Sequence, residues 1–144
     1  MSDTHTLVCG SCGAVNRIPS AKLADKPICG KCRKPFFQGK VLELAGSSFH
    51  RHIEKTSLPV VVDFWAPWCG PCKMMAPVFL DAAAKLEPRA RLVKLNTEED
   101  QRTAAHYHIQ SIPTLVLFRN GREAARKSGA MDLKNLLAWV NGQL

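Results

Sequence analysis

Residues 59–73 of this chain read PVVVDFWAPWCGPCK, and this stretch decides the fold. The run from Pro59 to Trp65 is apolar except for Asp63, which predicts a central strand that is covered on both faces. Cys69 and Cys72 follow directly, at the point where a helix is expected to begin. A strand that leads into a helix headed by a CxxC pair is typical of a dithiol redox site.

The segments on either side alternate between strand and helix patterns, which predicts an α/β domain. Strands are expected at residues 41–44, 59–65, 91–96, 115–118 and 123–127. Helices are expected after Ser47 or Ser48, from Cys69 to Pro88 with a kink at Pro77, at residues 101–107, and after Asp132. The last helix should present an apolar stripe made of Leu133, Leu136, Leu137, Val140 and Leu144.

Length and composition fit one domain with a small appendage, because the chain has 144 residues of which 46% are hydrophobic. The apolar stretch from Leu58 to Trp68 contains Pro59, Asp63 and Pro67, and it is shorter than the roughly 20 residues of a membrane span. We therefore expect no membrane association. The first residues do not have the pattern of a secretory signal, so the expected location is cytoplasmic.

The redox chemistry assigns different tasks to the two cysteines. A thiolate attacks a disulfide, and Cys69 at the N-terminus of a helix would have its negative charge stabilised while it remains exposed. Cys69 is therefore the predicted nucleophile, and Cys72, in the first turn, is the predicted resolving thiol. Gly70 permits close backbone approach, and Pro71 loses no hydrogen bond at a helix start. The alternative, half of a metal site or a structural bridge, lacks a second cysteine pair in the same domain.

Asp63 is the third candidate of this site. A carboxylate within a buried apolar strand is costly, and burial raises its pKa toward the range that is useful for proton transfer. The alternative is an aspartate at a strand edge that points to water.

Four further cysteines lie near the N-terminus, where Cys9 and Cys12 are separated by sixteen residues from Cys29 and Cys32. Two CxxC turns can complete a tetrahedral shell, so this spacing predicts a zinc ribbon with one zinc ion, structural or redox-sensitive. Two disulfides are the alternative, which a reducing cytosol disfavours. We expect a zinc-ribbon domain at residues 1–38 and a second domain at residues 39–144.

The net charge of the N-terminal segment, residues 1–40, depends on whether the cysteines bind a metal ion. The formal net charge of the chain is +8, and residues 1–40 carry seven Lys or Arg against two Asp, or +5. Four thiolates and one divalent zinc would lower that to about +3. We therefore do not expect nucleic acid as a partner.

The segment from Val62 to Lys73 resembles the active-site segment of thioredoxins. The resemblance continues through Lys94-Leu95-Asn96, Ser111-Ile112-Pro113-Thr114 and Asn120-Gly121 to Gly129, and covers about Val41 to Leu144. The segment from Cys9 to Pro19 is similar to the opening of the bacterial thioredoxin 2 subgroup. The resemblance implies a thioredoxin fold, with a five-stranded mixed sheet flanked by four helices. It also implies an NADPH-dependent thioredoxin reductase as the electron source and oxidised proteins such as reductases and peroxidases as acceptors.

The same resemblance implies roles for single residues. Asp63 would take the proton from Cys72, with Lys94 as its charge partner; a solvated strand lysine is the alternative for Lys94. Pro113 would form a cis peptide bond facing the CxxC pair, although a simple strand-start proline is the alternative reading of this residue. The implied substrate-binding residues are Trp68, Gly70, Pro71, Ile112, Pro113 and Gly129.

Three functions are compatible with these motifs. The first is a monomeric reductase of protein disulfides. The second is a binding module or redox sensor in which the zinc ribbon carries the function. The third, a disulfide donor or isomerase, is disfavoured because Gly70-Pro71 between the cysteines resembles the reductants of the family.

Overall fold

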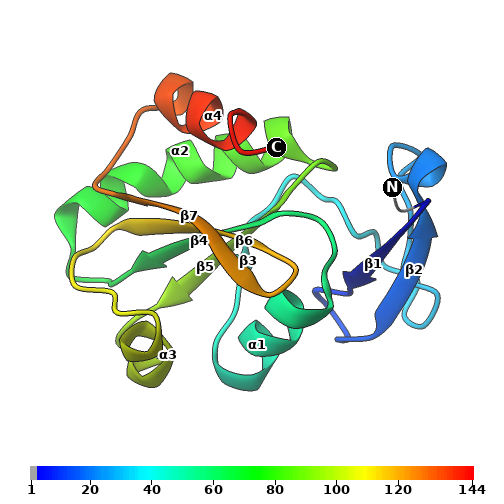
Figure 1. Cartoon of the computed structure of the whole chain (residues 1–144), viewed down its shortest axis with the longest axis horizontal. Coiled ribbons are helices and arrows are strands. Elements are labelled where there is room, and N and C mark those ends of the chain that lie inside the picture. The colour runs from blue at the N-terminus through cyan, green and yellow to red at the C-terminus, as the bar shows by residue number, and fades with distance from the viewer. Residues whose placement is uncertain (1–2) are drawn as a thin grey trace.

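The structure is a computed structural model that describes residues 3–144. The chain starts with a small antiparallel hairpin of β1 (Thr4–Val8) and β2 (Val15–Pro19), followed by a short 3-10 helix at Ser20–Lys22. An irregular segment then leads to the main body, which begins at β3 (Leu42–Glu43). Figure 1 shows the hairpin standing to one side of a larger sheet with helices on both faces.

The larger sheet has five strands in the order β3-β5-β4-β6-β7. Its strands are β4 (Val60–Trp65), β5 (Arg91–Asn96), β6 (Thr114–Arg119) and β7 (Arg122–Ser128) in addition to β3. The first three strands in that order are parallel, and β6 and β7 are antiparallel to their neighbours. The predicted mixed five-stranded sheet is confirmed, and β4 at its centre is the strand that leads into the CxxC pair.

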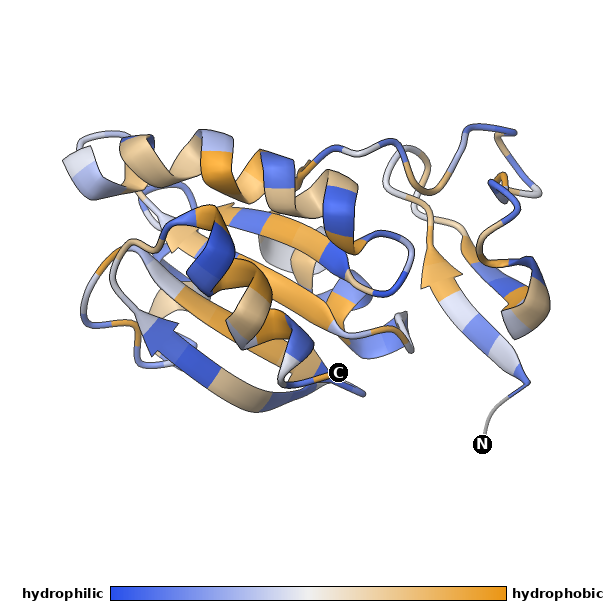
Figure 2. Ribbon diagram, turned by 90° about the horizontal axis from the view of Figure 1, so that it is seen from above, coloured by the Kyte–Doolittle hydropathy of each residue, from blue (hydrophilic) through white to orange (hydrophobic). Residues whose placement is uncertain are grey.

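Four helices cover the sheet, as predicted. They are α1 (Gly46–Lys55), α2 (Gly70–Leu86), α3 (Gln101–His106) and α4 (Leu133–Asn141). The core between the sheet and α2 with α4 contains Val61, Leu92 and Leu115 from the strands. The opposite core contains Val62, Val93 and Val116 from the strands, with α1 and the end of α3 packed over them. Figure 2 shows the hydrophobic strands enclosed between the helices.

Several boundaries differ from the sequence predictions. Helix α1 begins at Gly46 after Ala45, and the hydroxyl of Ser48 donates to the Ala45 carbonyl instead of capping the helix. The last helix is capped by Asp132 as predicted, but it ends at Asn141, and Leu144 lies beyond it with 44% of its surface exposed. The predicted stripe therefore stops at Val140, because the chain leaves the helix before its last apolar residue.

The N-terminal segment has a small core of its own. Leu7, Ile18 and Phe36 are buried together with Cys9 and Cys29, and Leu58 of the main body completes this cluster. Arg51 of α1 donates to the Gly13 carbonyl, which ties the first cysteine turn to the body. The N-terminal segment thus packs against α1 and against the loop between α1 and β4.

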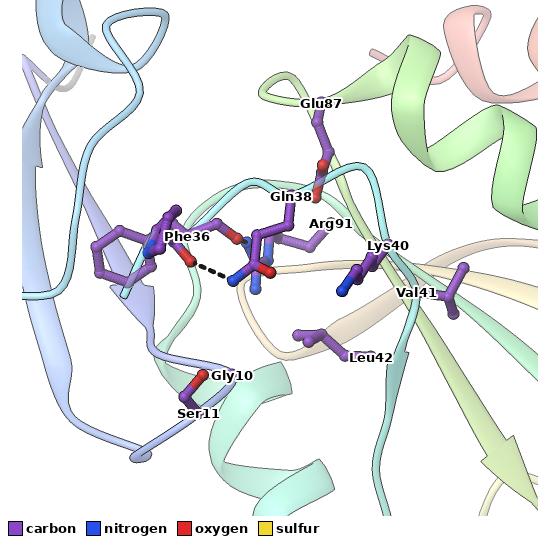
Figure 3. A pocket seen from close by; sticks show the side chains of 10 residues that line it. Gly10, Ser11, Phe36, Gln38, Lys40, Val41, Leu42, Glu87 and Arg91 are labelled. Atoms are coloured by element: carbon purple, nitrogen blue, oxygen red, sulfur yellow. Dashed lines mark hydrogen bonds between the residues drawn. The ribbon is translucent and has the colours of Figure 1, made fainter. Parts of the chain in front are cut away.

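A cavity of about 160 Å³ lies between the N-terminal segment and the sheet. Figure 3 shows the side chains that line it: Gln38 and Lys40 come from the segment before β3, and Glu87 and Arg91 come from the body. Within residues 3–144, no helix is long and apolar enough to cross a membrane.

Candidate functional site

The CxxC pair lies where β4 ends and α2 begins. Cys69 occupies the N-cap position of α2, and its sulfur accepts a hydrogen bond of 3.2 Å from the backbone N–H of Cys72. Pro71 stands in the first turn, where a missing N–H costs nothing. The two cysteines form a disulfide. The sequence prediction that the helix begins at this pair is confirmed, and the structure describes the oxidised form.

Neither sulfur is freely accessible in this form. Cys69 is only 4% exposed, although the sequence analysis expected it to remain exposed, because Ala66, Trp65 and Ile112 pack around the disulfide. The surface next to the disulfide is exposed and apolar. Trp68 is 68% exposed and Met74 is 74% exposed. An exposed apolar surface of this kind beside a reactive group is typical of a protein-binding site.

The loop before β6 comes within contact distance of the disulfide. The Sγ of Cys69 lies 3.7 Å from the carbonyl oxygen of Ile112. The Ile112–Pro113 peptide bond is cis, as the resemblance implied. Gly129 has a φ of +94° and donates from its backbone N–H to the Pro113 carbonyl over 2.9 Å. The structure therefore brings Ile112, Pro113 and Gly129 together at one edge of the CxxC pair.

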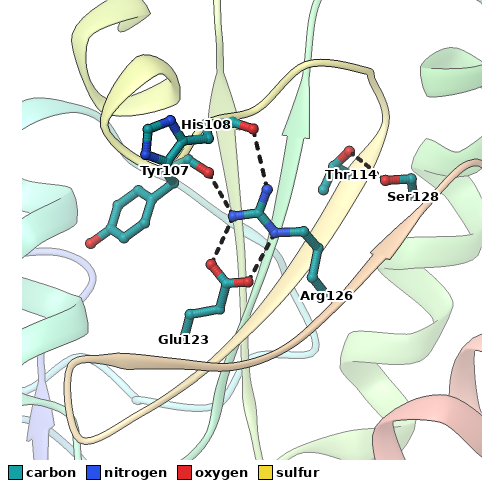
Figure 4. A network of polar contacts seen from close by, with 6 residues as sticks. All are labelled: Tyr107, His108, Thr114, Glu123, Arg126 and Ser128. Atoms are coloured by element: carbon teal, nitrogen blue, oxygen red, sulfur yellow. Dashed lines mark hydrogen bonds and ion pairs between the residues drawn. The ribbon is translucent and has the colours of Figure 1, made fainter.

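This loop is also fixed from below by β7 (Figure 4). The guanidinium of Arg126 forms a bidentate pair with Glu123, at 2.7 and 2.9 Å, and donates to the carbonyl oxygens of Tyr107 and His108. Thr114 adds a bond of 2.6 Å to the Ser111 carbonyl. The carbonyls of His108 and Tyr107 lie eighteen and nineteen residues before Arg126, and a contact at that separation leaves no local signal in the sequence.

Trp68 has a fixed orientation in spite of its exposure. Its indole N–H donates to the Glu98 carboxylate over 2.7 Å, which holds the ring beside the CxxC pair. The sequence analysis did not identify Glu98, which lies in a loop without a motif.

Asp63 is buried in the middle of β4, with 1% of its surface exposed. One carboxylate oxygen, Oδ1, has no hydrogen-bond partner among the described residues. Burial raises the pKa of Asp63 to about 7, against the lowering by Lys94 and with a smaller raising contribution from Glu43. The alternative of a solvent-facing aspartate is therefore wrong, and this carboxyl can exchange a proton near neutral pH.

Lys94 lies beside Asp63 on the neighbouring strand, where the two residues are register partners. Its ammonium lies 4.6 Å from the centre of the Trp65 ring, a cation–π contact. In the described part of the chain, Lys94 makes no ion pair within 4.0 Å. It therefore acts on Asp63 at a distance through its charge.

The four N-terminal cysteines converge as the spacing predicted. The sulfurs of Cys9, Cys12, Cys29 and Cys32 all lie within 4.8 Å of one another, and none is in a disulfide. The pairs Cys9–Cys32 and Cys12–Cys29 are 3.6 Å apart. Sulfurs on a tetrahedral zinc, at about 2.3 Å from the metal, are separated by roughly 3.8 Å, so the cluster fits one such ion.

Donors around the cluster also fit thiolates. The backbone N–H groups of Ser11 and Cys12 point at the Cys9 sulfur, and that of Lys31 points at the Cys29 sulfur, at 3.3 to 3.5 Å. The Asn16 amide also donates to Cys29. Donors of this kind favour the deprotonated sulfurs that zinc requires.

Comparisons with known proteins agree with both sites. The family model described as thioredoxin matches residues 40–142, and the model described as the N-terminal part of thioredoxin 2 matches residues 8–34. Thioredoxin C-3 of Corynebacterium nephridii is 45% identical over 138 residues, which cover 96% of this chain and 94% of that protein.

Thioredoxins without a comparable head match the body alone. The thioredoxin of Acidithiobacillus ferridurans is 43% identical over 72% of this chain and 96% of its own length. The thioredoxin of Rickettsia typhi is 42% identical over 65% of this chain and 90% of its own length. The chain therefore belongs to the thioredoxin family, as a protein-disulfide reductase of the thioredoxin 2 type with a zinc-ribbon segment ahead of the thioredoxin fold.

Proposed function

We propose that this thioredoxin reduces protein disulfides with Cys69 as the nucleophile and Cys72 as the resolving thiol. The position of Cys69 at the N-cap of α2 carries this assignment, because the free backbone N–H groups and the helix dipole favour a thiolate there. Cys72 lies within the first turn of the helix, behind the N-cap position, and its sulfur is within bonding reach of the Cys69 sulfur.

The exchange proceeds in two steps. The Cys69 thiolate attacks one sulfur of the substrate disulfide, which forms a mixed disulfide and releases the other substrate sulfur as a thiolate. Asp63 then accepts the proton of Cys72, and the Cys72 thiolate attacks the Cys69 sulfur. The second substrate thiolate leaves, and the Cys69–Cys72 disulfide remains. Two electrons have passed from the dithiol to the substrate.

The buried position of Asp63 supports its role as the proton acceptor. Its pKa of about 7, raised by burial, makes the carboxylate a base of suitable strength for a thiol near neutral pH. Lys94 would moderate this pKa through its positive charge.

Substrate would bind over the exposed surface beside the disulfide. We assign this surface to Trp68, Gly70, Pro71, Ile112, Pro113 and Gly129. The Ile112 main chain is well placed to pair with an extended substrate segment, because the loop that carries it is held on both sides by β7.

The thioredoxin disulfide would be reduced again by an NADPH-dependent thioredoxin reductase, and its acceptors would be oxidised proteins such as reductases and peroxidases. Such a cycle belongs to a reducing compartment, so we propose a cytoplasmic location. We also propose that the protein is a monomer.

For the N-terminal segment we propose a zinc-ribbon domain at residues 1–38 that precedes a thioredoxin domain at residues 39–144. Cys9, Cys12, Cys29 and Cys32 would hold one zinc ion. Bound zinc supplies a charged tetrahedral crosslink, and its role here is structural because the small core of this segment includes two of the ligands. Oxidation of the thiolates would release the metal.

The decisive experiment supplies purified protein with thioredoxin reductase, NADPH and insulin as the substrate disulfide. Wild type should turn over, and Cys72→Ser should accumulate a mixed disulfide on Cys69. A mixed disulfide on Cys72 in the matched Cys69→Ser variant instead would reverse the two assignments.

A metal analysis of the same preparation tests the ribbon separately. One zinc per chain is expected in the reduced protein, and fewer after peroxide treatment. Reduced protein without zinc would refute the zinc assignment and leave the redox assignment untouched.

A further inference from the structure

Three charged residues stand in one row across the sheet. Glu43 on β3 is the register partner of Lys94 on β5, and Lys94 is the register partner of Asp63 on β4. Register partners on adjacent parallel strands project to the same face, here the α2 face that also holds Cys72. Glu43 and Asp63 are thus two strand spacings apart, roughly 9.5 Å between their main chains, with the lysine between them.

The outer part of this row lines an open groove of about 520 Å³ between β3 and α2. Glu43 and Lys94 form its charged wall together with Lys40. The α2 wall is apolar, with Ala76 and Leu80 among its residues. Glu43 therefore meets solvent, whereas Asp63 lies buried at the inner end of the row.

Lys94 is not committed to either carboxylate. It forms no ion pair within 4.0 Å in the part of the chain described, and the Asp63 Oδ1 atom has no hydrogen-bond partner there. A positive charge that is shared between two carboxylates stabilises each of them less than it would stabilise one alone.

We propose that Glu43 is a positioning residue that raises the proton affinity of Asp63 by placing a negative charge on the far side of Lys94 in this row. The Lys94 ammonium lies over the Trp65 ring on the strand of Asp63, so the Glu43 charge on β3 offsets the lysine charge from across β5, and the buried carboxyl retains its proton to higher pH as a result. This inference rests on the proposed role of Asp63 as the proton acceptor for Cys72.

The other charged groups around the row are few. Burial raises the pKa of Glu43, Lys94 lowers it, and Glu99 adds a smaller raising effect. Lys40 faces Glu43 from the groove, and Lys127 on β7 continues the row beyond Leu115 at the far edge of the sheet. On α2, which covers this face, Cys72 is held in the disulfide and does not titrate in that form.

The test is a carboxyl-carbon NMR titration of Asp63 in the oxidised full-length protein, where Cys72 cannot contribute. Glu43→Gln keeps the size of the side chain on an exposed edge position, so the fold is retained. We expect the Asp63 midpoint to fall by about half a pH unit, as a charge at this separation in a partly solvated site produces. Glu54→Gln, an exposed charge change on α1 behind the opposite face of the sheet, is the matched control and should leave the midpoint unchanged.

A second variant fixes the direction of the effect. Lys94→Gln should raise the Asp63 midpoint, opposite to Glu43→Gln. A midpoint in Glu43→Gln that equals wild type, or that rises, overturns the inference.

The pH profile of insulin reduction separates this inference from the proposed function. If Asp63 is the proton acceptor, the inflection of the turnover profile moves with the NMR midpoint in Glu43→Gln. A midpoint that moves while the profile stays in place supports the role of Glu43 and refutes the catalytic role of Asp63.

Discussion

The guanidinium of Arg91 donates a hydrogen bond of 2.6 Å to the main-chain carbonyl of Phe36, so a residue of β5 holds the end of the N-terminal segment. Arg91 is 3% exposed, and its guanidinium also lies 5.2 Å from the centre of the Phe37 ring. Glu87 faces the same region and accepts a hydrogen bond of 2.8 Å from the Gly39 N–H. Specific hydrogen bonds from a buried arginine and to a carboxylate therefore connect the two parts of the chain.

Replacing this arginine should loosen that connection. Arg91→Met leaves the buried Phe36 carbonyl without its donor and removes a positive charge near Glu87, and we expect the free energy of unfolding to fall by about 2 to 3 kcal/mol. Urea unfolding measures this loss, and limited proteolysis should cut faster between residues 38 and 40. The exposed Arg89→Met is the control. Equal stability and equal cutting in the two variants would show that the contact does not hold the segment.

Asp63→Asn should stabilise the protein at alkaline pH. Burial raises the pKa of Asp63 to about 7 from the ordinary 3.8, so the folded state binds the proton more tightly than the unfolded state. Stability is then complete below pH 4 and is lost as the pH rises through 7. At pH 8 we expect a gain of about 3 to 4 kcal/mol for the amide variant, by urea unfolding.

The gain must shrink as the pH falls, because the wild-type carboxyl becomes neutral in both states. At pH 5 it should be less than half of its value at pH 8. A gain of the same size at both pH values would mean that the amide acts through packing and not through the buried charge.

His52 gives a dependence of opposite sign. It is 5% exposed because α1 packs against β1, and burial, with Arg91 and Arg51, lowers its pKa to about 4 from 6.5. The unfolded state then binds more protons between pH 6.5 and 4, so stability is lost as the pH falls through this window. Between pH 7 and pH 5 the histidine should cost about 2 kcal/mol.

The measurement compares urea unfolding at pH 7 and pH 5 in wild type and His52→Gln. We expect the drop between the two pH values to be about 2 kcal/mol smaller in the variant. His50→Gln is the control. An equal drop in wild type and His52→Gln would place the acid sensitivity elsewhere.

The parts of the fold that the sequence predicted depend on local signals. The apolar run of β4, the CxxC pair that opens α2 and the Asp132 cap are each contained within a few consecutive residues, so the local pattern is enough to predict them. The zinc-type cluster was also predictable, because the spacing of its cysteines is itself the signal.

The contacts that the sequence did not reveal join distant segments. Arg91 donates to the carbonyl of Phe36, 55 residues earlier in the chain, and His52 is buried on α1, the helix against which β1 packs. Nothing in the local sequence distinguishes the buried His52 from the partly exposed His50. The burial of Cys69 likewise depends on the loop that carries Ile112, which lies 43 residues further along the chain.

Arg126 provides a test of such a distant contact at the loop that we propose binds substrate. Its forked guanidinium bonds Glu123 and the carbonyls of Tyr107 and His108 at once, which a lysine cannot do. Because the loop from these carbonyls leads to Ile112, Arg126→Lys should let it move and weaken substrate docking. The pair is about one-third exposed, so the effect is modest.

We expect the KM for insulin to rise about threefold in Arg126→Lys with kcat nearly unchanged, since the reacting sulfurs keep their geometry. Steady-state assays with reductase and NADPH measure both constants. The control is Arg122→Lys on the same strand, which makes the same substitution and also conserves the charge. A fall in kcat at unchanged KM would place Arg126 in the chemistry of the exchange, and identical constants in both variants would show that β7 does not hold the loop through this residue.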